Sequence, residues 1–164
     1  MNVFPYNRFD AASYAVKWAY FRNPAYYSFD DIGGDCTNFV SQSVYAGSGV
    51  MNYTPTYGWY YINADERSPS WTGVEYFYNF MTTNEGAGPF AEDTSIDNIE
   101  IGDVIQLGDS DGRFYHSLVV VRIFPYRTFD SVFVSAHDED SNFRRLSSYE
   151  FSSIRYIHFL GVRR

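Results

Sequence analysis

The sequence predicts an α+β fold in which helices pack on an antiparallel sheet. Apolar residues recur at helical spacing in the first half of the chain, and short runs rich in β-branched residues follow in the second half. The length of 164 residues suits a single domain, residues 1–164, with a substantial core. Helices followed by strands that can pair antiparallel are typical of the α+β class.

The first and third helices are marked by signals at their ends. The first is expected to begin at Asn7, with an acidic residue three positions later as in a capping box, and to end before Asn23-Pro24. A polar, aromatic loop then covers residues 51–69. Thr72 and Glu75 form a second capping-box pattern. The residues behind it share one helical face, and they are Val74, Phe77, Tyr78 and Met81.

The second helix carries the only cysteine of the chain. It is expected to begin at Asp35 or Cys36, directly after Gly33-Gly34, and to stop at Gly47. Its buried face would consist of Phe39, Val40 and Val44.

Strand patterns begin after a Gly-rich breaker at residues 84–89. Residues 108–112 have the composition of a turn. Residues 118–121 are apolar on both faces of their strand, which predicts a place in the centre of the sheet. The expected strands cover residues 104–107, 114–124, 131–137 and 154–162.

Charge and hydropathy restrict the partners. The formal net charge of -8 argues against nucleic acid and anionic membrane surfaces, which both need a basic face. No apolar run approaches the ~20 residues that cross a bilayer, so we expect no membrane insertion. No signal peptide is visible either. The chain is therefore expected to be cytosolic, or to be one domain of a longer exported, multidomain protein.

The aromatic content is high, with 16 Tyr, 15 Phe and 3 Trp. These side chains can fill a core, or they can line a groove that binds sugars or peptides. We expect the loop before the third helix to form one wall of a substrate groove beside the cysteine, with Trp59, Tyr61 and Trp71 as substrate-binding residues. The alternative is that Trp71 simply fills the core before its helix.

Cys36 cannot form a disulfide within the chain, because it has no cysteine partner. At a helix N-terminus, unpaired N–H groups and a partial positive charge can stabilise a thiolate, which is the nucleophilic form. The same N–H groups can stabilise the oxyanion of a tetrahedral intermediate. The alternative is a buried structural cysteine that behaves as a small apolar residue.

His116 opens the long central strand and could take a proton from a thiol on a packed helix. A base works better when a third group orients it, and the next strand ends at His137-Asp138. We assign His137, because a charged Asp138 would continue a buried apolar face unless the strand has ended; Asp138 is the alternative. No histidine pair has helical ligand spacing and no calcium loop is complete, so no metal or cofactor is expected.

Residues 33–42, Gly-Gly-Asp-Cys-Thr-Asn-Phe-Val-Ser-Gln, resemble the nucleophile motif of the bacterial "putative amidase domain" family. That family is related to the papain-like cell-wall hydrolases of the CHAP and NlpC types. Further pieces resemble the family in the same order along the chain, and they are Tyr6-Asn7-Arg8, Asn23-Pro24, Ser68-Pro69-Ser70-Trp71, Gly102-Asp103-Val104-Ile105-Gln106 and His116-Ser117.

The resemblance implies a papain-like fold and a cysteine amidase or peptidase that cleaves an amide or peptide bond, expected in peptidoglycan stem peptides. It implies that Cys36 is the nucleophile, that His116 is the base, and that the third member lies around His137. Asp35, beside the nucleophile, is a further candidate for substrate binding. An extracellular place at the cell wall, within a longer exported protein, is expected. The alternative function is a catalytically silent, aromatic-rich module that binds glycan or peptide.

Overall fold

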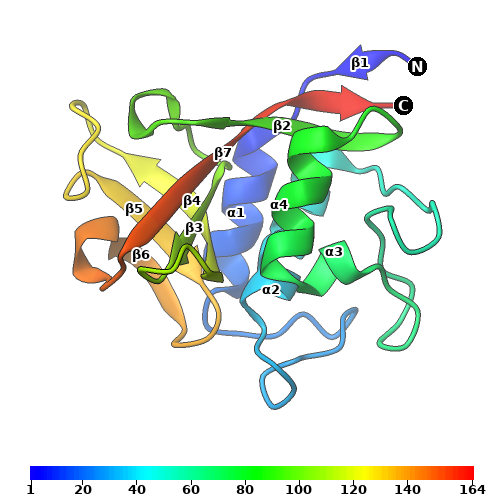
Figure 1. Cartoon of the computed structure of the whole chain (residues 1–164), viewed down its shortest axis with the longest axis horizontal. Coiled ribbons are helices and arrows are strands. Elements are labelled where there is room, and N and C mark those ends of the chain that lie inside the picture. The colour runs from blue at the N-terminus through cyan, green and yellow to red at the C-terminus, as the bar shows by residue number, and fades with distance from the viewer.

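A computed structural model describes all 164 residues and confirms the α+β class (Figure 1). Four helices and a sheet of seven strands form the structure. The helices are α1 (Arg8–Trp18), α2 (Cys36–Ser48), α3 (Pro69–Thr72) and α4 (Val74–Thr83). The strands are β1 (Val3–Phe4), β2 (Gly88–Thr94), β3 (Val104–Gly108), β4 (Phe114–Ile123), β5 (Val132–Ala136), β6 (Ser141–Arg145) and β7 (Ser153–Arg163).

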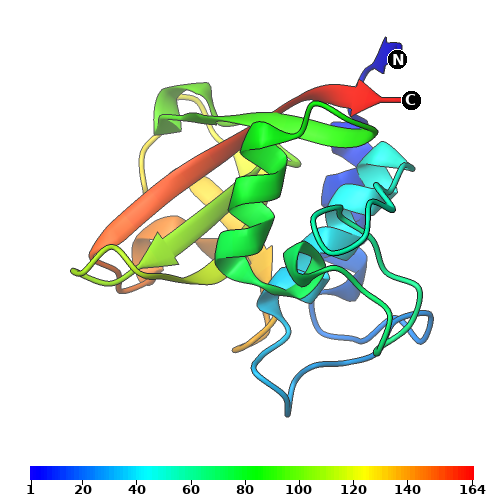
Figure 2. The same cartoon turned by 45° about the vertical axis from the view of Figure 1, so that its right-hand side comes forward.

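The sheet is antiparallel throughout, in the order β1-β7-β3-β4-β5-β6, and β2 also pairs with β7. The helices gather on one side of the strongly twisted sheet (Figure 2). One core cluster lies between helices and sheet, and it includes Val104 and Val119. A second cluster, which includes Ile105, Leu118 and Val120, occupies the opposite face of β3 and β4. The prediction that the strand at 114–124 is central and buried on both faces is confirmed.

The boundaries of α2 depend on the neighbouring helix. α2 begins at Cys36, as expected, but it ends at Ser48, and the residue that caps it is Gly49, which has a left-handed φ of 64°. The predicted stop at Gly47 is wrong. Gly47 lies inside α2, where an added Cβ would stand 2.7 Å from the carbonyl oxygen of Asn7. Glycine is therefore required at this position so that α1 can approach α2 closely.

The ends of the other helices and the positions of the strands agree with the predictions in part. Asn7 caps α1, because its Oδ1 accepts the Asp10 N–H at 3.0 Å. The capping box at Thr72 is wrong, because extended backbone at Gly73 ends α3 and begins α4 without a side-chain cap. The four predicted strands are confirmed as β3, β4, β5 and β7. β1, β2 and β6 were not predicted, since none of them has an alternating apolar pattern.

A buried ion pair connects α1 to the sheet. The fully buried Asp103 carboxylate accepts hydrogen bonds from Arg8 Nη1 at 2.6 Å and from the Phe159 and Glu100 N–H groups at 3.0 and 2.9 Å. His158 Nδ1 lies 2.7 Å from the same carboxylate. These contacts give the Tyr6-Asn7-Arg8 and Gly102-Asp103 motif pieces a structural role. None of the helices combines the length and apolar character needed to cross a bilayer.

Arg8→Ala is expected to lower the free energy of unfolding by about 3 kcal/mol, because it leaves the buried Asp103 carboxylate without its cation. The melting temperature should fall by roughly 6–12 °C. Urea unfolding followed by circular dichroism measures this. Lys17→Ala, an exposed cation on the same helix, is the matched control and should change stability by less than about 0.5 kcal/mol. Equal losses of unfolding free energy in both variants would show that the ion pair between Arg8 and Asp103 does not stabilise the fold specifically.

Candidate active site

Asp35 anchors the loop that precedes α2. It is fully buried. Its Oδ1 accepts hydrogen bonds from the Phe29 N–H at 2.8 Å and from Asn38 Nδ2 at 2.9 Å, and its Oδ2 lies 2.5 Å from His137 Nδ1. The predicted contact of Asp35 with substrate is therefore not available in this structure. Asp35 instead fixes the position of Cys36, the first residue of α2.

The carboxylate of Asp138 covers the N-terminus of α2. Its Oδ1 accepts the Asp35 N–H at 2.8 Å and its Oδ2 accepts the Cys36 N–H at 3.2 Å. This close approach requires a glycine at position 34, where an added Cβ would stand within 2.4 Å of Asp138 Oδ2 and φ is 99°. Gly34 thus admits the Asp138 carboxylate to the helix end.

The thiol of Cys36 lies against β4. Only 6% of the residue is exposed, and Sγ is 4.0 Å from the Tyr115 carbonyl oxygen and 3.7 Å from Thr37 Oγ1. The thiol is therefore next in space to the strand residue that precedes His116. No hydrogen bond joins Sγ to the His116 ring in this arrangement.

A buried polar chain fixes α2 against the sheet beside the thiol. Thr37 Oγ1 and Ser117 Oγ lie 3.0 Å apart. Gln106 Nε2 donates to Ser117 Oγ at 3.1 Å and to the Val74 carbonyl at 3.0 Å. Residues from α2, β4, β3 and α4 are thereby tied together. This chain accounts for the Gln and Ser positions in two of the motif pieces.

The pKa of the Cys36 thiol is raised to about 11, chiefly by burial and further by the negative charge of Asp138. A hydrogen bond from the Ser117 backbone acts in the opposite direction but is outweighed. The expectation that the helix N-terminus stabilises a thiolate is not met here. The main reason is burial of the thiol, and in addition a carboxylate already occupies the N–H groups that would stabilise a thiolate.

His116 lies on β4 opposite Leu107 of β3 and faces a cavity of about 580 Å³ that Asp138 also lines. Its ring makes no hydrogen bond within the protein, and the nearest aromatic ring is Tyr149, at 5.9 Å between centroids. Burial lowers the pKa of His116, Arg144 lowers it further, and Asp138 opposes both. The imidazole is therefore neutral at pH 7 and can accept a proton.

His137 is engaged away from His116. Its Nδ1 meets Asp35, and its Nε2 lies 2.8 Å from the Trp18 carbonyl oxygen and 3.1 Å from Arg22 Nη1. Only 2% of the residue is exposed. Both ring nitrogens are thus used in a buried network, which does not fit the predicted role of His137 as the partner of His116.

The turn after β5 explains this outcome. β5 ends at Ala136, and both Asp138 and Glu139 have left-handed φ angles, of 62° and 65°. Strand alternation therefore does not extend to residues 137 and 138. The His137 ring packs against α2, where it stacks on Phe39. The Asp138 carboxylate lies at the start of α2, and its negative charge acts to raise the pKa values of both Cys36 and His116. Asp138, the alternative candidate for the third member, lines the same cavity as His116, whereas His137 does not.

Arg22 belongs to the same network, although the sequence patterns did not indicate it. Its guanidinium forms bidentate pairs with Asp30, at 2.8 and 2.8 Å, and with Asp140, at 3.0 and 2.9 Å. It thereby connects the segment after α1 to the turn that holds His137. The excess of carboxylates in residues 30–35 and 138–140 was the available signal, because buried or paired acidic clusters need a cation.

The aromatic residues predicted for substrate binding form core instead. Trp59 and Trp71 are fully buried, and their rings lie 4.8 Å apart. Their indole N–H groups donate to Ser41 Oγ and Asn38 Oδ1 on α2, at 3.1 and 3.0 Å. The predicted groove wall is therefore wrong for both tryptophans, and the alternative, Trp71 as core, is confirmed. Tyr61 is half-buried, and its hydroxyl accepts the Tyr27 N–H at 2.7 Å.

No three His, Cys, Asp or Glu side chains converge in a way that suits a metal ion. The Cys36 thiol, the His116 imidazole and the Asp138 carboxylate come from the start of α2, from β4 and from the turn after β5. Asp138 accepts the Cys36 N–H and lines the same cavity as His116.

The "putative amidase domain" family model matches residues 5–160, and the chain belongs to this family. The family name indicates amide hydrolysis at a general level. The chain is also similar to the uncharacterized protein YhbB of Bacillus subtilis (strain 168), with 34% identity over 164 residues that cover 96% of this chain and 50% of the relative. The chain thus spans about half the length of that relative. No solved structure matches.

Alkylation by iodoacetamide tests the electrostatics at Cys36. Between pH 7 and 10 the native thiol should react more slowly than a free thiol of pKa ~8.5, because its pKa is raised to about 11. Asp138→Asn removes the nearby negative charge, so it should lower that pKa and speed the reaction at pH 7. Glu139→Gln, an exposed neighbour, is the control and should have no effect. A native midpoint below 8.5 would contradict the described geometry.

Proposed function

We propose that this chain is a cysteine amidase or peptidase in which Cys36 is the nucleophile and His116 is the general base. The supporting observation is the position of the thiol, held at the first residue of a buried helix against the strand that carries His116. Asp138 affects the charge of both groups, so the three side chains form one electrostatic unit. The family assignment supports amide hydrolysis in general terms.

The proposed reaction starts from an uncharged thiol and an uncharged imidazole. When substrate binds, a change of the Cys36 rotamer brings Sγ to His116. Sγ attacks the amide carbonyl carbon while His116 takes the thiol proton, and a tetrahedral oxyanion forms. The oxyanion collapses, the C–N bond breaks, and His116 gives its proton to the leaving amine. Water, deprotonated by His116, then hydrolyses the thioester and regenerates the thiol.

Asp138 has two positions in this proposal. In the resting structure its carboxylate takes the N–H groups of Asp35 and Cys36, which are the donors best placed to stabilise an oxyanion. Movement of the carboxylate into the cavity that it shares with His116 would free those donors and place a negative charge beside the imidazolium. Asp138 is therefore proposed as the third catalytic member, and His137 as the residue that positions Asp35.

The proposed substrate is a peptide such as a peptidoglycan stem peptide. The cavity beside His116 is lined by the carboxylates of Asp138, Glu139 and Glu150 and by one cation, Arg144. This balance favours a substrate that carries an amino group. A place at the cell wall, within a longer exported protein, belongs to the same proposal. The alternative, a silent binding module, is favoured by the buried thiol and by its missing hydrogen bond to His116.

Digestion of purified peptidoglycan, with mass spectrometry of the soluble products, tests the proposed function. The wild type should release fragments with new amino groups, whereas Cys36→Ala and His116→Ala should release none while keeping the wild-type melting temperature. Binding without release by the wild type would identify the silent module instead. Undiminished release by Cys36→Ala would exclude the thiol as nucleophile.

The pH dependence of kcat/KM should follow His116. A protonated imidazole cannot accept the thiol proton, so kcat/KM should fall as the pH decreases through the pKa of His116. Burial places that pKa below its usual value of 6.5, so the loss should occur below pH 6.5. An acid limb centred above pH 7 would contradict this environment for His116.

The two candidates for the third member can be separated by comparing kcat with stability. Asp138→Asn keeps only one of the two acceptors for the helix N–H groups and removes the charge, so kcat should fall by roughly 10²–10⁴ while stability falls by only about 1 kcal/mol. His137→Asn disturbs the buried pair with Asp35, so stability should fall by about 2 kcal/mol with a smaller effect on kcat. A larger loss of kcat in His137→Asn than in Asp138→Asn would identify His137 as the third member instead.

A further inference from the structure

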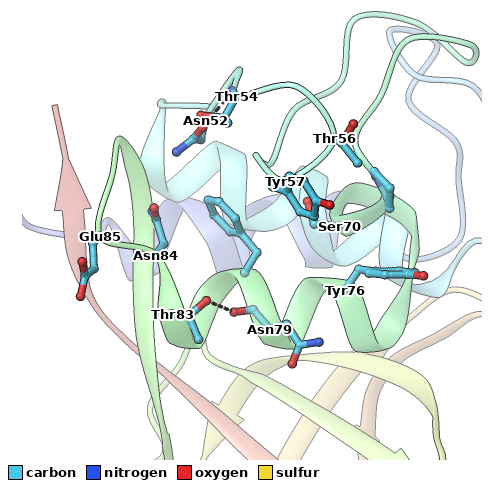
Figure 3. Close-up of a pocket in the computed structure, with 12 residues that line it drawn as sticks. Asn52, Thr54, Thr56, Tyr57, Ser70, Tyr76, Asn79, Thr83, Asn84 and Glu85 are labelled. Carbon is cyan, nitrogen blue, oxygen red and sulfur yellow. Dashed lines mark hydrogen bonds between the residues drawn. The ribbon is translucent and has the colours of Figure 1, made fainter.

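We infer that a second site on this chain binds an uncharged oligosaccharide. A pocket of about 490 Å³ lies between α4 and the loop that follows α2 (Figure 3). Its edge at Asn52 comes just beyond the C-terminal end of α2, whereas Cys36 is at the other end of that helix of 13 residues. A helix of that length spans ~20 Å, so the pocket is separate from the candidate active site. This inference does not depend on the proposed function.

Two tyrosine rings stand exposed at this pocket. Tyr57 of the loop is 85% exposed and Tyr76 of α4 is 62% exposed, and the pocket extends to the nearly buried Phe80. Figure 3 shows Tyr57 on the loop side and Tyr76 on the α4 side of the pocket. Tyrosine offers an apolar ring and a polar tip, which suits the apolar face and the hydroxyl rim of a sugar ring.

The free polar groups of the pocket are amide, hydroxyl and carboxylate. The side chains of Asn79, Thr54, Thr56 and Glu85 line it and make no hydrogen bond within the protein. Asn79 and Glu85 are exposed on the α4 side, and the two threonines are exposed on the loop side. A ligand can therefore receive hydrogen bonds from both sides of the pocket.

The frame around these free groups is rigid. Asn52 Nδ2 and Asn84 Nδ2 both donate to the Ala87 carbonyl, at 3.0 and 3.1 Å. Ser70 Oγ donates to the Gly58 carbonyl at 2.6 Å. Because these polar side chains are already held, the pocket shape exists before a ligand arrives, which lowers the entropic cost of binding.

The loop that presents Tyr57 has a strained backbone. Thr56 has a φ of 66°, a left-handed conformation that a β-branched residue rarely adopts. The following Gly58 is packed so closely that an added Cβ would stand 2.1 Å from the Asn52 carbonyl oxygen. Strain of this kind persists where the surrounding structure enforces it, and it often accompanies binding sites. Tyr57, the next residue, is 85% exposed.

The chemistry of the lining favours a neutral sugar over a peptide. No Lys or Arg lines the pocket, and Glu85 is its only charged residue. An anionic ligand would lack a cation there. A peptide in extended form would be expected to pair with a sheet edge or to have its termini captured by backbone groups, and the pocket lies between a helix and a loop. Hydroxyl, amide and aromatic groups together match the surface of an oligosaccharide.

Isothermal titration calorimetry with tetra-N-acetylchitotetraose tests this inference. All pocket variants are made in the Cys36→Ala protein, so that no heat from catalytic turnover contributes to the measured binding heat. Saturable binding is expected, and Tyr57→Ala, Tyr76→Ala and Asn79→Ala should each raise Kd by roughly five- to tenfold at an unchanged melting temperature. Tyr20→Ala removes a tyrosine that is 58% exposed outside the pocket, and it should leave Kd unchanged.

Two results would overturn the inference. One is the absence of saturable binding at millimolar sugar. The other is an equal loss of affinity in Tyr20→Ala and in the three pocket variants. A tetra-alanine peptide should not bind; peptide binding that Tyr57→Ala abolishes, without sugar binding, would assign the pocket to a peptide. A negative sugar titration would leave the proposed hydrolysis at Cys36 untouched, and a negative digestion experiment would leave the proposed sugar site untouched.

Discussion

The burial of α2 is the constraint on which the rest of the structure depends. Of its 13 residues, 11 are buried, and several of these are polar. Buried polar groups must find partners, since each unpaired group costs roughly 1–3 kcal/mol. Asn38 and Ser41 therefore bond to Trp71 and Trp59, and Thr37 bonds to Ser117 of β4. The resulting contacts fix the loop, the sheet and the start of the helix relative to one another.

The same constraint shapes the chemistry at the helix start. The helix N–H groups are buried, and Asp138 satisfies them in the resting structure. The carboxylate that stabilises the helix end also raises the pKa of the Cys36 thiol. On the proposed mechanism, stability of the resting fold and reactivity of the thiol compete for the same two donors. Substrate binding would have to move Asp138 before the thiol and His116 could react.

Local sequence signals predicted those elements that local chemistry determines, including the Asn7 cap and the apolar central strand. They could not separate Gly47 from Gly49 as the end of α2, because that choice depends on how closely α1 approaches. Aromatic density did not distinguish core tryptophans from groove residues, since the partners of their N–H groups lie on a distant helix. The opposite roles of His137 and Asp138 depend on left-handed turn residues, which alternation does not reveal.

The proposed mechanism requires that Cys36 forms a covalent intermediate with the carbonyl group of the substrate. Acid quenching during peptidoglycan digestion, followed by mass spectrometry of the peptide that contains Cys36, tests it most directly. We expect a substrate-derived acyl group on Cys36 that hydroxylamine removes, and no such adduct in His116→Ala. Continued digestion by a protein whose Cys36 thiol has been blocked by prior alkylation would contradict it.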